Sequence, residues 1–221
     1  MKKDEATPYL IKAYFILKGN FSPLLMLLVV SVIVPLIQKE PNFASLLFGN
    51  LVMLLLYPVV YGQYTEIVLR HRRVNYPILF RRHFLNFFLI SILLWLPLIF
   101  IVFIGLTLKS NVGFLMLLYS IVISSLSIYV FPLVFITGKK LKSIEIGFKC
   151  VLGNLQFNLP LMMIVSAATV LPYLVSFPHT GDGKSFNVVA LAFLTIISLV
   201  VEFWMFVAAI LILKDKGLVG E

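Results

Sequence analysis

The stretch LISILLWLPLIFIVFIGL, residues 89–106, contains no charged side chain over eighteen residues. A helix needs about 20 apolar residues to cross the hydrocarbon core of a bilayer. A transmembrane strand would alternate apolar and polar residues, and neither this stretch nor LLMLLVVSVIVPLI at 24–37 alternates. Both stretches therefore predict membrane-spanning α-helices.

The rest of the chain has the same character. Hydrophobic residues make up 61% of the 221 residues, charged residues make up only 12%, and the mean hydropathy is +1.06. These values lie outside the usual composition of soluble domains. We predict a single transmembrane domain over residues 1–221, folded as an all-α polytopic integral membrane helical bundle. Its six transmembrane helices are expected at about 21–37, 43–69, 84–108, 113–137, 155–177 and 186–213.

The positions of lysine and arginine predict how the chain lies in the membrane. With six spans, fifteen of the eighteen basic residues fall on one side, and only Lys39, Lys109 and Lys184 fall on the other. Basic residues are retained on the cytoplasmic side during insertion. We therefore expect a multi-pass protein of the bacterial cytoplasmic (inner) membrane with both termini in the cytoplasm. One span more or fewer would send basic loops to the wrong side.

This distribution also explains the net charge of +9. Two basic segments adjoin the predicted spans, and short segments of this kind meet the anionic headgroups of the bilayer. Their basic residues are Arg70, Arg72, Arg73, Arg81 and Arg82 in the first and Lys139, Lys140, Lys142 and Lys149 in the second. We predict that these residues dock anionic lipid headgroups or an acidic partner protein, and we expect no nucleic-acid partner.

Three basic segments share one arrangement, in which a partly amphipathic stretch reaches an Asn just before an apolar run. They are PYLIKAYFILKGNF (8–21), NYPILFRRHFLNFF (75–88) and KSIEIGFKCVLGNLQF (142–157). The asparagines, Asn20, Asn86 and Asn154, are 66 and 68 residues apart. A near-constant period predicts three repeated hairpin units, each an interfacial segment followed by two helices. The alternative is that any six-span protein has hairpins of similar length.

The third of these segments predicts an amphipathic helix. Leu141, Ile144, Phe148 and Val151 recur at helical spacing, and the lysines lie largely on other faces. Such a helix lies in the membrane interface, with its apolar side towards the lipid and its lysines among the headgroups. We therefore expect interfacial amphipathic segments between the spans.

The stretch FPLVFITGKKLKSIEIGFKCVLGN, residues 131–154, contains a span that ends near a proline, a basic turn, an amphipathic segment and a Gly-Asn pair. ILKGNF at 16–21 has similar features. This element resembles one found in bacterial six-helix membrane proteins similar to the membrane domain of glycerophosphoryl diester phosphodiesterases. The resemblance implies a six-helix membrane fold. It implies no chemistry, because the catalytic domain of those enzymes is separate from the membrane part, and we assign no phosphodiesterase activity.

No catalytic or metal-binding pattern falls on one side of the membrane. His71 and His83 belong to the arginine-rich loop, whereas His179 lies on the opposite side, so the three cannot share a metal ion. No Ser-His-Asp set can be placed on one side, and the chain has no HExxH motif. We expect no catalytic residue, no metal and no cofactor.

Two acidic residues fall within the predicted spans. Glu66 lies four residues before Arg70 at the end of its span, which predicts a helical i,i+4 ion pair with a structural role. Glu202 lies twelve residues before Lys214, about 18 Å along a helix and so near the middle of the bilayer. A charge at that depth costs roughly 2.5–3.5 kcal/mol, and such residues usually face other helices or a watery cavity.

Polar residues of two other spans fall at the depth of Glu202. Tyr57 recurs at helical spacing with two further tyrosines, and Ser124 and Ser125 belong to a serine-rich span. We predict an intramembrane polar site formed by Glu202, Tyr57, and Ser124 or Ser125. The alternative is a structural role, because serines let helices approach closely and a neutral Glu bonded to Tyr or Ser holds helices together.

Two functions follow from these patterns. The first is a non-enzymatic membrane-embedded subunit or scaffold, which packs on a partner protein or on further copies of itself while its basic segments bind anionic lipid. The second is a small transporter or lipid-handling protein with its polar site around Glu202. An intramembrane enzyme is disfavoured because no nucleophile and base can be paired. We favour the first function, because the soluble segments are short and the polar site around Glu202 has few members, with no second charged residue at its depth.

Overall fold

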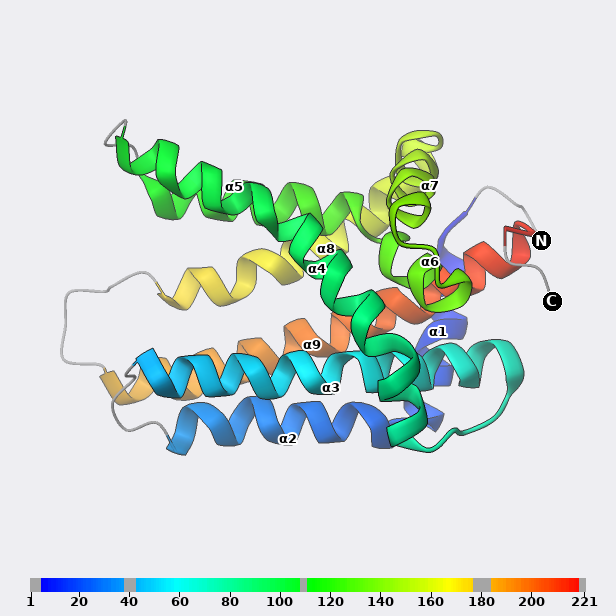
Figure 1. Cartoon of the computed structure of the whole chain (residues 1–221), viewed down its shortest axis with the longest axis horizontal. Helices are drawn as coiled ribbons and strands as arrows, with labels where there is room; N and C mark the ends of the chain where they lie inside the picture. The colour runs from blue at the N-terminus through cyan, green and yellow to red at the C-terminus, as the bar shows by residue number, and fades with distance from the viewer. Residues whose placement is uncertain (1–4, 38–42, 108–110, 177–183, 219–221) are drawn as a thin grey trace.

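The computed structural model describes residues 5–37, 43–107, 111–176 and 184–218, and this part of the chain is helical apart from its turns. Nine helices occupy the described residues (Figure 1). They are α1 (Thr7–Gly19), α2 (Ser22–Ile37), α3 (Phe43–Arg70), α4 (Tyr76–Thr107), α5 (Val112–Leu126), α6 (Val130–Thr137), α7 (Lys140–Leu152), α8 (Leu155–Ser176) and α9 (Lys184–Asp215). The prediction of an all-α fold is confirmed for these residues.

Four of the six predicted stretches coincide with single helices to within two residues, and these helices are α2, α3, α8 and α9. The stretch predicted at 84–108 belongs to a longer helix, because α4 begins at Tyr76. The carbonyl of Asn75 accepts hydrogen bonds from the amides of Ile78 and Leu79. Pro77 fits this first turn because no donor is needed there. The basic segment 76–83 is thus the first part of α4.

The stretch predicted at 113–137 is two helices, so the prediction of one continuous helix is wrong here. Helices α5 and α6 meet at a bend of 48°. Pro132 contributes to this break, because it has no amide hydrogen to donate to the carbonyl of Ile128. The hydroxyl of Tyr129, which lies between the two helices, donates to Oδ1 of Asn158 at 2.7 Å. This hydrogen bond ties the break to α8.

Three helical stretches are each long and apolar enough to cross a bilayer: Leu51–Arg70 of α3, the whole of α4, and Ala192–Asp215 of α9. Three bent pairs pass the same test when each is taken together. They are α1 with α2 at 79°, α5 with α6, and α7 with α8 at 106°. The described chain is therefore a helical bundle with three to six candidate membrane spans.

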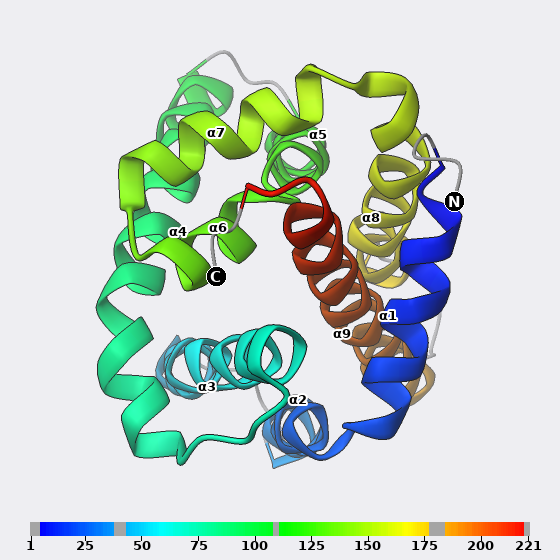
Figure 2. The same cartoon turned by 90° about the vertical axis from the view of Figure 1, so that its right-hand side faces the viewer.

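Several helices run along the length of the molecule, and shorter segments frame one of its ends (Figure 1). Helices α2, α3, α5, α8 and α9 lie lengthwise in Figure 1, and α4 crosses from the lower helices to the upper ones. Figure 2 looks at the right-hand end, where α1, α7 and the first part of α4 surround the lengthwise helices. Helix α1 packs on α9, α7 packs on α6, and α4 joins α3 to α5.

Helix α7 covers the predicted amphipathic segment, and it packs against the protein mainly through small residues. Its buried residues are Ser143, Gly147 and Val151, whereas the side chain of Leu141 is 71% exposed. A Cβ atom at Gly147 would lie 2.7 Å from Cγ2 of Val130 in α6. The small residues of α7 are thus the ones that approach α6, whereas Leu141 of the predicted apolar face lies outside this contact.

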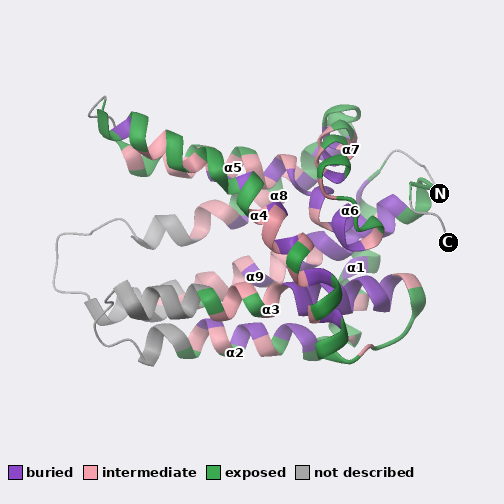
Figure 3. Cartoon of the chain, in the orientation of Figure 1, coloured by how far each residue is buried: buried purple, intermediate pink, exposed green. Residues whose placement is uncertain are grey.

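Buried side chains concentrate at the end framed by α1 and α7 (Figure 3). Tyr64, Tyr129 and Phe203 are among the largest fully buried side chains. The candidate spans of α3 and α9 are each 61% buried, whereas that of α4 is 17% buried and exposes Phe100 and Phe103. Large exposed apolar surfaces mark contact with a membrane or with another protein.

Candidate binding site around Glu202

Glu202 of α9 faces α3, where two tyrosines hold its carboxyl group. Tyr57 and Tyr61 lie four residues apart on α3, so their side chains share one face of that helix. The hydroxyl of Tyr57 donates to Oε2 of Glu202 at 3.2 Å, and the hydroxyl of Tyr61 donates to Oε1. Each carboxyl oxygen therefore has a neutral donor. None of the ion pairs found among the described residues involves Glu202.

Aromatic rings fix the positions of these two hydroxyls. The ring centroids of Phe203 and Phe206 lie 4.7 and 4.3 Å from that of Tyr61. Phe87 of α4 stacks on Tyr57, with the two ring centroids 6.0 Å apart. Hydrogen bonds in such low-dielectric surroundings are electrostatically stronger than in water. The aromatic contacts thus keep the donors of α3 directed at the acceptor of α9.

A cavity of about 470 Å³ opens beside Glu202 and is lined by residues of α3, α4, α5, α6, α8 and α9. Most of the lining side chains are apolar. The polar lining residues are Tyr57, Tyr61, Ser91, Ser124, Ser127, Thr169, Ser198 and Glu202. Ligand pockets typically enclose roughly 300–1,000 Å³ and combine a mainly apolar wall with a few polar groups. The cavity has the size and the composition of a ligand site.

Two hydroxyl groups of this cavity already donate to nearby backbone carbonyls. Ser127 donates to the carbonyl of Ser124 at 3.3 Å, and Thr169 donates to the carbonyl of Val165 at 2.9 Å. A hydroxyl whose proton is used in this way can still accept a hydrogen bond. Together with the Glu202 carboxyl, these oxygens offer acceptors to the donor groups of a ligand.

The structure brings three of the four predicted site residues together. Glu202, Tyr57 and Ser124 line the same cavity. Ser125 belongs instead to the contact between α5 and α8, where its Oγ lies 3.1 Å from Oγ of Ser166. Of the two serines that the sequence left open, Ser124 therefore lines the cavity and Ser125 does not.

The predicted site omits five polar residues that line the cavity, and these are Tyr61, Ser91, Ser127, Thr169 and Ser198. Tyr61 could have been found, because it lies one helical turn after Tyr57 and so on the same face of α3. Thr169 and Ser198 lie on α8 and α9. Nothing in the sequence distinguishes these two from the other small polar residues of the spans, and only the packing of the helices brings them to the cavity.

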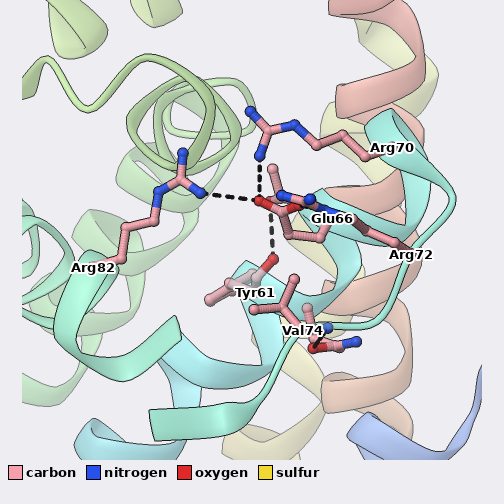
Figure 4. Close-up of polar contacts among 8 residues, drawn as sticks. Tyr61, Glu66, Arg70, Arg72, Val74 and Arg82 are labelled. Atoms are coloured by element: carbon pink, nitrogen blue, oxygen red, sulfur yellow. Dashed lines mark hydrogen bonds and ion pairs between the residues drawn. The ribbon is translucent and has the colours of Figure 1, made fainter. Parts of the chain in front are cut away.

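The predicted arginine-rich segment surrounds a second buried carboxyl group, that of Glu66, which is 3% exposed (Figure 4). Nη1 of Arg70 lies 2.6 Å and Nη1 of Arg82 lies 3.1 Å from Oε1 of Glu66. Nε of Arg72 lies 2.9 Å from Oε2. The contact with Arg70 is the predicted i,i+4 pair. Arg72 and Arg82 are additional partners, which come from the loop after α3 and from α4.

The other predicted docking residues lie outside this cluster. Nη2 of Arg73 lies 3.5 Å from Oδ1 of Asn20, and Arg81 is exposed. Lys149 forms an exposed pair with Glu145 at 2.6 Å. The remaining lysines at the beginning of α7 are Lys139, Lys140 and Lys142. The predicted docking residues are thus divided between three half-exposed arginines around the buried Glu66 and a set of mostly exposed side chains outside this cluster.

The histidines do not form a metal site in the part of the chain that the structure describes. His83 is buried against the ring of Phe135, and its Nε2 atom has no hydrogen-bond partner among the described residues. His71 is exposed, and His179 lies outside the described residues. No group of three or more His, Cys, Asp or Glu side chains in the described part could hold a metal ion.

Comparison with known proteins does not identify the site. No family model, curated protein or solved structure matches the chain. The resemblance to the membrane domain of glycerophosphoryl diester phosphodiesterases therefore stays a prediction. Function depends on the geometry and chemistry of a site rather than on the fold that holds it.

Proposed function

We propose that the chain is a small transporter or lipid-handling protein, which takes one amphipathic molecule into the cavity beside Glu202. One observation carries this proposal. The Glu202 carboxyl, with two tyrosine donors, forms part of the wall of a mainly apolar cavity of about 470 Å³. A ligand with a polar head and an apolar body complements both the carboxyl and the rest of the wall.

A purely structural role for Glu202 would account for the tyrosine contacts but not for the cavity. Helices joined by a buried polar group are expected to pack closely around it, as protein interiors do elsewhere. Here residues of four further helices share a cavity with the carboxyl. An ionisable group within a membrane is costly and usually marks the path of a ligand or an ion. The combination supports binding as the role of Glu202.

The wall of the cavity indicates the chemistry of the ligand. The Glu202 carboxyl and the serine and threonine oxygens suit a head group that donates hydrogen bonds, such as a hydroxyl or an ammonium group. Phe87, Trp95 and Phe131 offer aromatic faces, which pack against apolar groups and attract cations. We therefore expect a lipid or lipid-like molecule with a hydrogen-bond donor in its head group.

We further infer that all six candidate spans cross the bacterial cytoplasmic membrane, with both termini in the cytoplasm. In support, α1, the first part of α4 and α7 frame the same end of the molecule, and each contains basic residues (Figure 2). Each of these segments leads into a pair of candidate spans, which supports three hairpin units. The bends after α1 and α7 have no counterpart within α4.

Native mass spectrometry of the full chain, extracted gently from its own membrane, tests the proposal. The wild-type chain is expected to retain a small molecule of defined mass. The double variant Glu202→Gln, Tyr61→Phe should retain it with an affinity lower by roughly tenfold or more, since hydrogen bonds to charged groups contribute about 1.5–3 kcal/mol. Ser125→Ala is the matched control, because this side chain contacts α8 and does not line the cavity.

A second variant tests the contribution of the cavity to binding independently of the Glu202 carboxyl group. Ser124→Phe adds an aromatic ring to the wall of the cavity and leaves the hydrogen bonds of Glu202 intact. We expect it to displace the ligand as well. A wild-type chain that carries no small molecule, or a ligand whose occupancy is the same in both variants and in the wild type, would contradict the proposal.

A subunit or scaffold function is the second candidate, and the exposed face of α4 favours it. The α4 span is 17% buried against 61% for α3 and α9, and the side chains of Phe100 and Phe103 are 63% and 68% exposed. Such a face suits a partner protein or a second copy of the chain as well as lipid. The same mass spectra test this candidate, because a stoichiometric partner chain or a defined homo-oligomer would support it and a monomer would count against it.

A further inference from the structure

The ion pairs around Glu66 are unbalanced in charge and in exposure. One carboxylate meets three guanidinium groups, those of Arg70, Arg72 and Arg82. The side chain of Glu66 is 4% exposed, whereas the three arginine side chains are 48%, 57% and 50% exposed. The negative charge is therefore enclosed, and an excess of positive charge faces outwards.

Each guanidinium group uses only part of its donor capacity on Glu66. Arg70 and Arg82 each donate from one terminal nitrogen, and Arg72 donates from Nε. A guanidinium group carries five N–H donors in a planar fork that matches phosphate and carboxylate oxygens. Figure 4 shows Arg70 and Arg82 approaching Glu66 from different helices. Glu66 thus holds the guanidinium group of Arg70 on α3 near that of Arg82 on α4. Each guanidinium group keeps further N–H donors for another acceptor.

A small hollow adjoins the guanidinium groups of Arg70 and Arg82. It has a volume of about 20 Å³ and is lined by Glu66, Thr65, Leu69, Arg70, Arg82 and side chains of α6. A space of this size holds one oxygen-sized group, since about 10–15 Å³ suffices for a water molecule. Arg70 and Arg82 make part of its wall basic, and Leu69 and the α6 residues Phe135 and Ile136 make another part apolar. One oxygen of a phosphate group can enter between the arginines while the ester-linked part lies along the apolar wall.

The cluster also lies at the end of the bundle where lipid headgroups are expected. Helix α3 ends at Arg70 and α6 ends at Thr137, next to the lysines that begin α7. Basic residues beside candidate spans meet the anionic surface of the membrane. At this level the acyl chains of a bound phospholipid would remain in the bilayer, whereas a soluble phosphate would have no such second contact.

We propose that Arg70, Arg72 and Arg82, oriented by Glu66, bind the phosphate group of an anionic phospholipid at the edge of the bilayer. Two guanidinium forks on one phosphate supply charge-assisted, bidentate hydrogen bonds. Glu66 is a positioning residue, because it contacts the arginines rather than the lipid. The site is separate from the Glu202 cavity and stands whether or not that cavity binds a ligand.

Titration of the purified full chain with phosphatidylglycerol, followed by native mass spectrometry, tests the site. Arg82→Gln should weaken binding by roughly tenfold, because it removes the charge-assisted hydrogen bonds of one guanidinium group. Arg81→Gln is the matched control, because it removes the same charge from the next residue, whose exposed side chain forms no ion pair with Glu66. This control should bind phosphatidylglycerol as the wild type does.

Arg82→Lys keeps the test informative if Arg82→Gln fails to fold. The lysine retains the positive charge beside Glu66 but loses the planar fork, so we expect a folded protein with weaker binding than the wild type. The proposal would be overturned if Arg81→Gln and Arg82→Gln lost the same affinity for phosphatidylglycerol, or if Arg82→Lys bound it as the wild type does. Either result would mean that the overall positive charge, rather than the guanidinium groups around Glu66, accounts for lipid binding. Displacement of the lipid by an equal concentration of glycerol phosphate would also overturn it, because the site would then recognise a soluble phosphate.

Discussion

Glu66 and Glu202 are both carboxyl groups within the helices of the bundle, and the protein surrounds them in opposite ways. Glu66, near the end of α3, meets three guanidinium groups and adjoins only a small hollow. Glu202, within α9, meets two tyrosine hydroxyls and a cavity of about 470 Å³. Cations reach a carboxylate easily at the edge of a bilayer, whereas deeper in the bilayer a second charge would add to the cost.

The difference in surroundings indicates different roles for the two carboxyl groups. Both oxygens of Glu66 accept hydrogen bonds, from partners on α3, the following loop and α4, so the group joins elements of the fold. The carboxyl of Glu202 joins α9 to α3 and also faces a cavity. We therefore expect substitutions of Glu66 to change stability most and substitutions of Glu202 to change ligand binding most.

The largest effect on stability is expected for Glu66→Ala. Removing one partner of a buried ion pair typically costs about 3–5 kcal/mol, and the half-exposed arginines reduce this to about 2 kcal/mol because water can solvate them. Thermal unfolding of the purified protein in detergent measures the loss, and retention of the cavity ligand is expected. A Glu66→Ala protein as stable as the wild type would mean that the carboxylate does not join α3 to α4.

Gly62→Ala should have the next largest effect, through the contact between α3 and α4. A Cβ atom at Gly62 would lie 2.9 Å from Cδ2 of His83 and 3.3 Å from Cδ2 of Leu79. Overpacking of this kind typically costs about 1–3 kcal/mol. Because Arg82 precedes His83, its contact with Glu66 should weaken as well, and phosphatidylglycerol binding should fall in the same variant.

Gly19→Ala is the matched control for that substitution. A Cβ atom at Gly19 would meet nothing within 4 Å, so unfolding and lipid binding should match the wild type. Unchanged stability in Gly62→Ala would show that His83 moves aside without disturbing the helix contact. The link between this contact and the arginine cluster would then be lost.

Removing the polar groups around Glu202 together should leave stability nearly unchanged. Buried polar partners can be replaced jointly by apolar groups at little cost, whereas removing one partner leaves the other unsatisfied. The triple variant Glu202→Met, Tyr57→Phe, Tyr61→Phe should unfold within about 1 kcal/mol of the wild type while losing the ligand. A large loss of stability would instead support a structural role for Glu202.

The contrast between the two acids also shows what sequence patterns can predict here. Apolar runs identify the helices, and counting residues from the basic segments placed Tyr57 and Ser124 at the depth of Glu202, where the structure has one cavity. Spacing along one helix identifies the contact of Glu66 with Arg70. Arg82 contacts Glu66 across a helix interface, and the relative rotation of neighbouring helices is not encoded in the period of either one.

Two local features of the structure are not visible in hydropathy alone. Pro132 cannot donate the backbone hydrogen bond that would continue α5 into α6, so an unbroken apolar run does not give an unbroken helix. On α7 the face with the largest apolar residues is only partly buried, because Gly147 is what lets that helix approach Val130. Hydropathy measures apolar character and does not register how closely two backbones can approach.

The smallest effect is expected for Glu145→Gln, which removes a carboxylate that also forms an i,i+4 pair, with Lys149 at 2.6 Å. Both side chains of this pair are largely exposed, and exposed ion pairs contribute little because water and salt screen them. Thermal unfolding and phosphatidylglycerol binding should both match the wild type. If Glu145→Gln instead changed lipid binding as much as Arg82→Gln, the total charge of this end of the molecule would control binding, and the buried contact of Glu66 would have no special role.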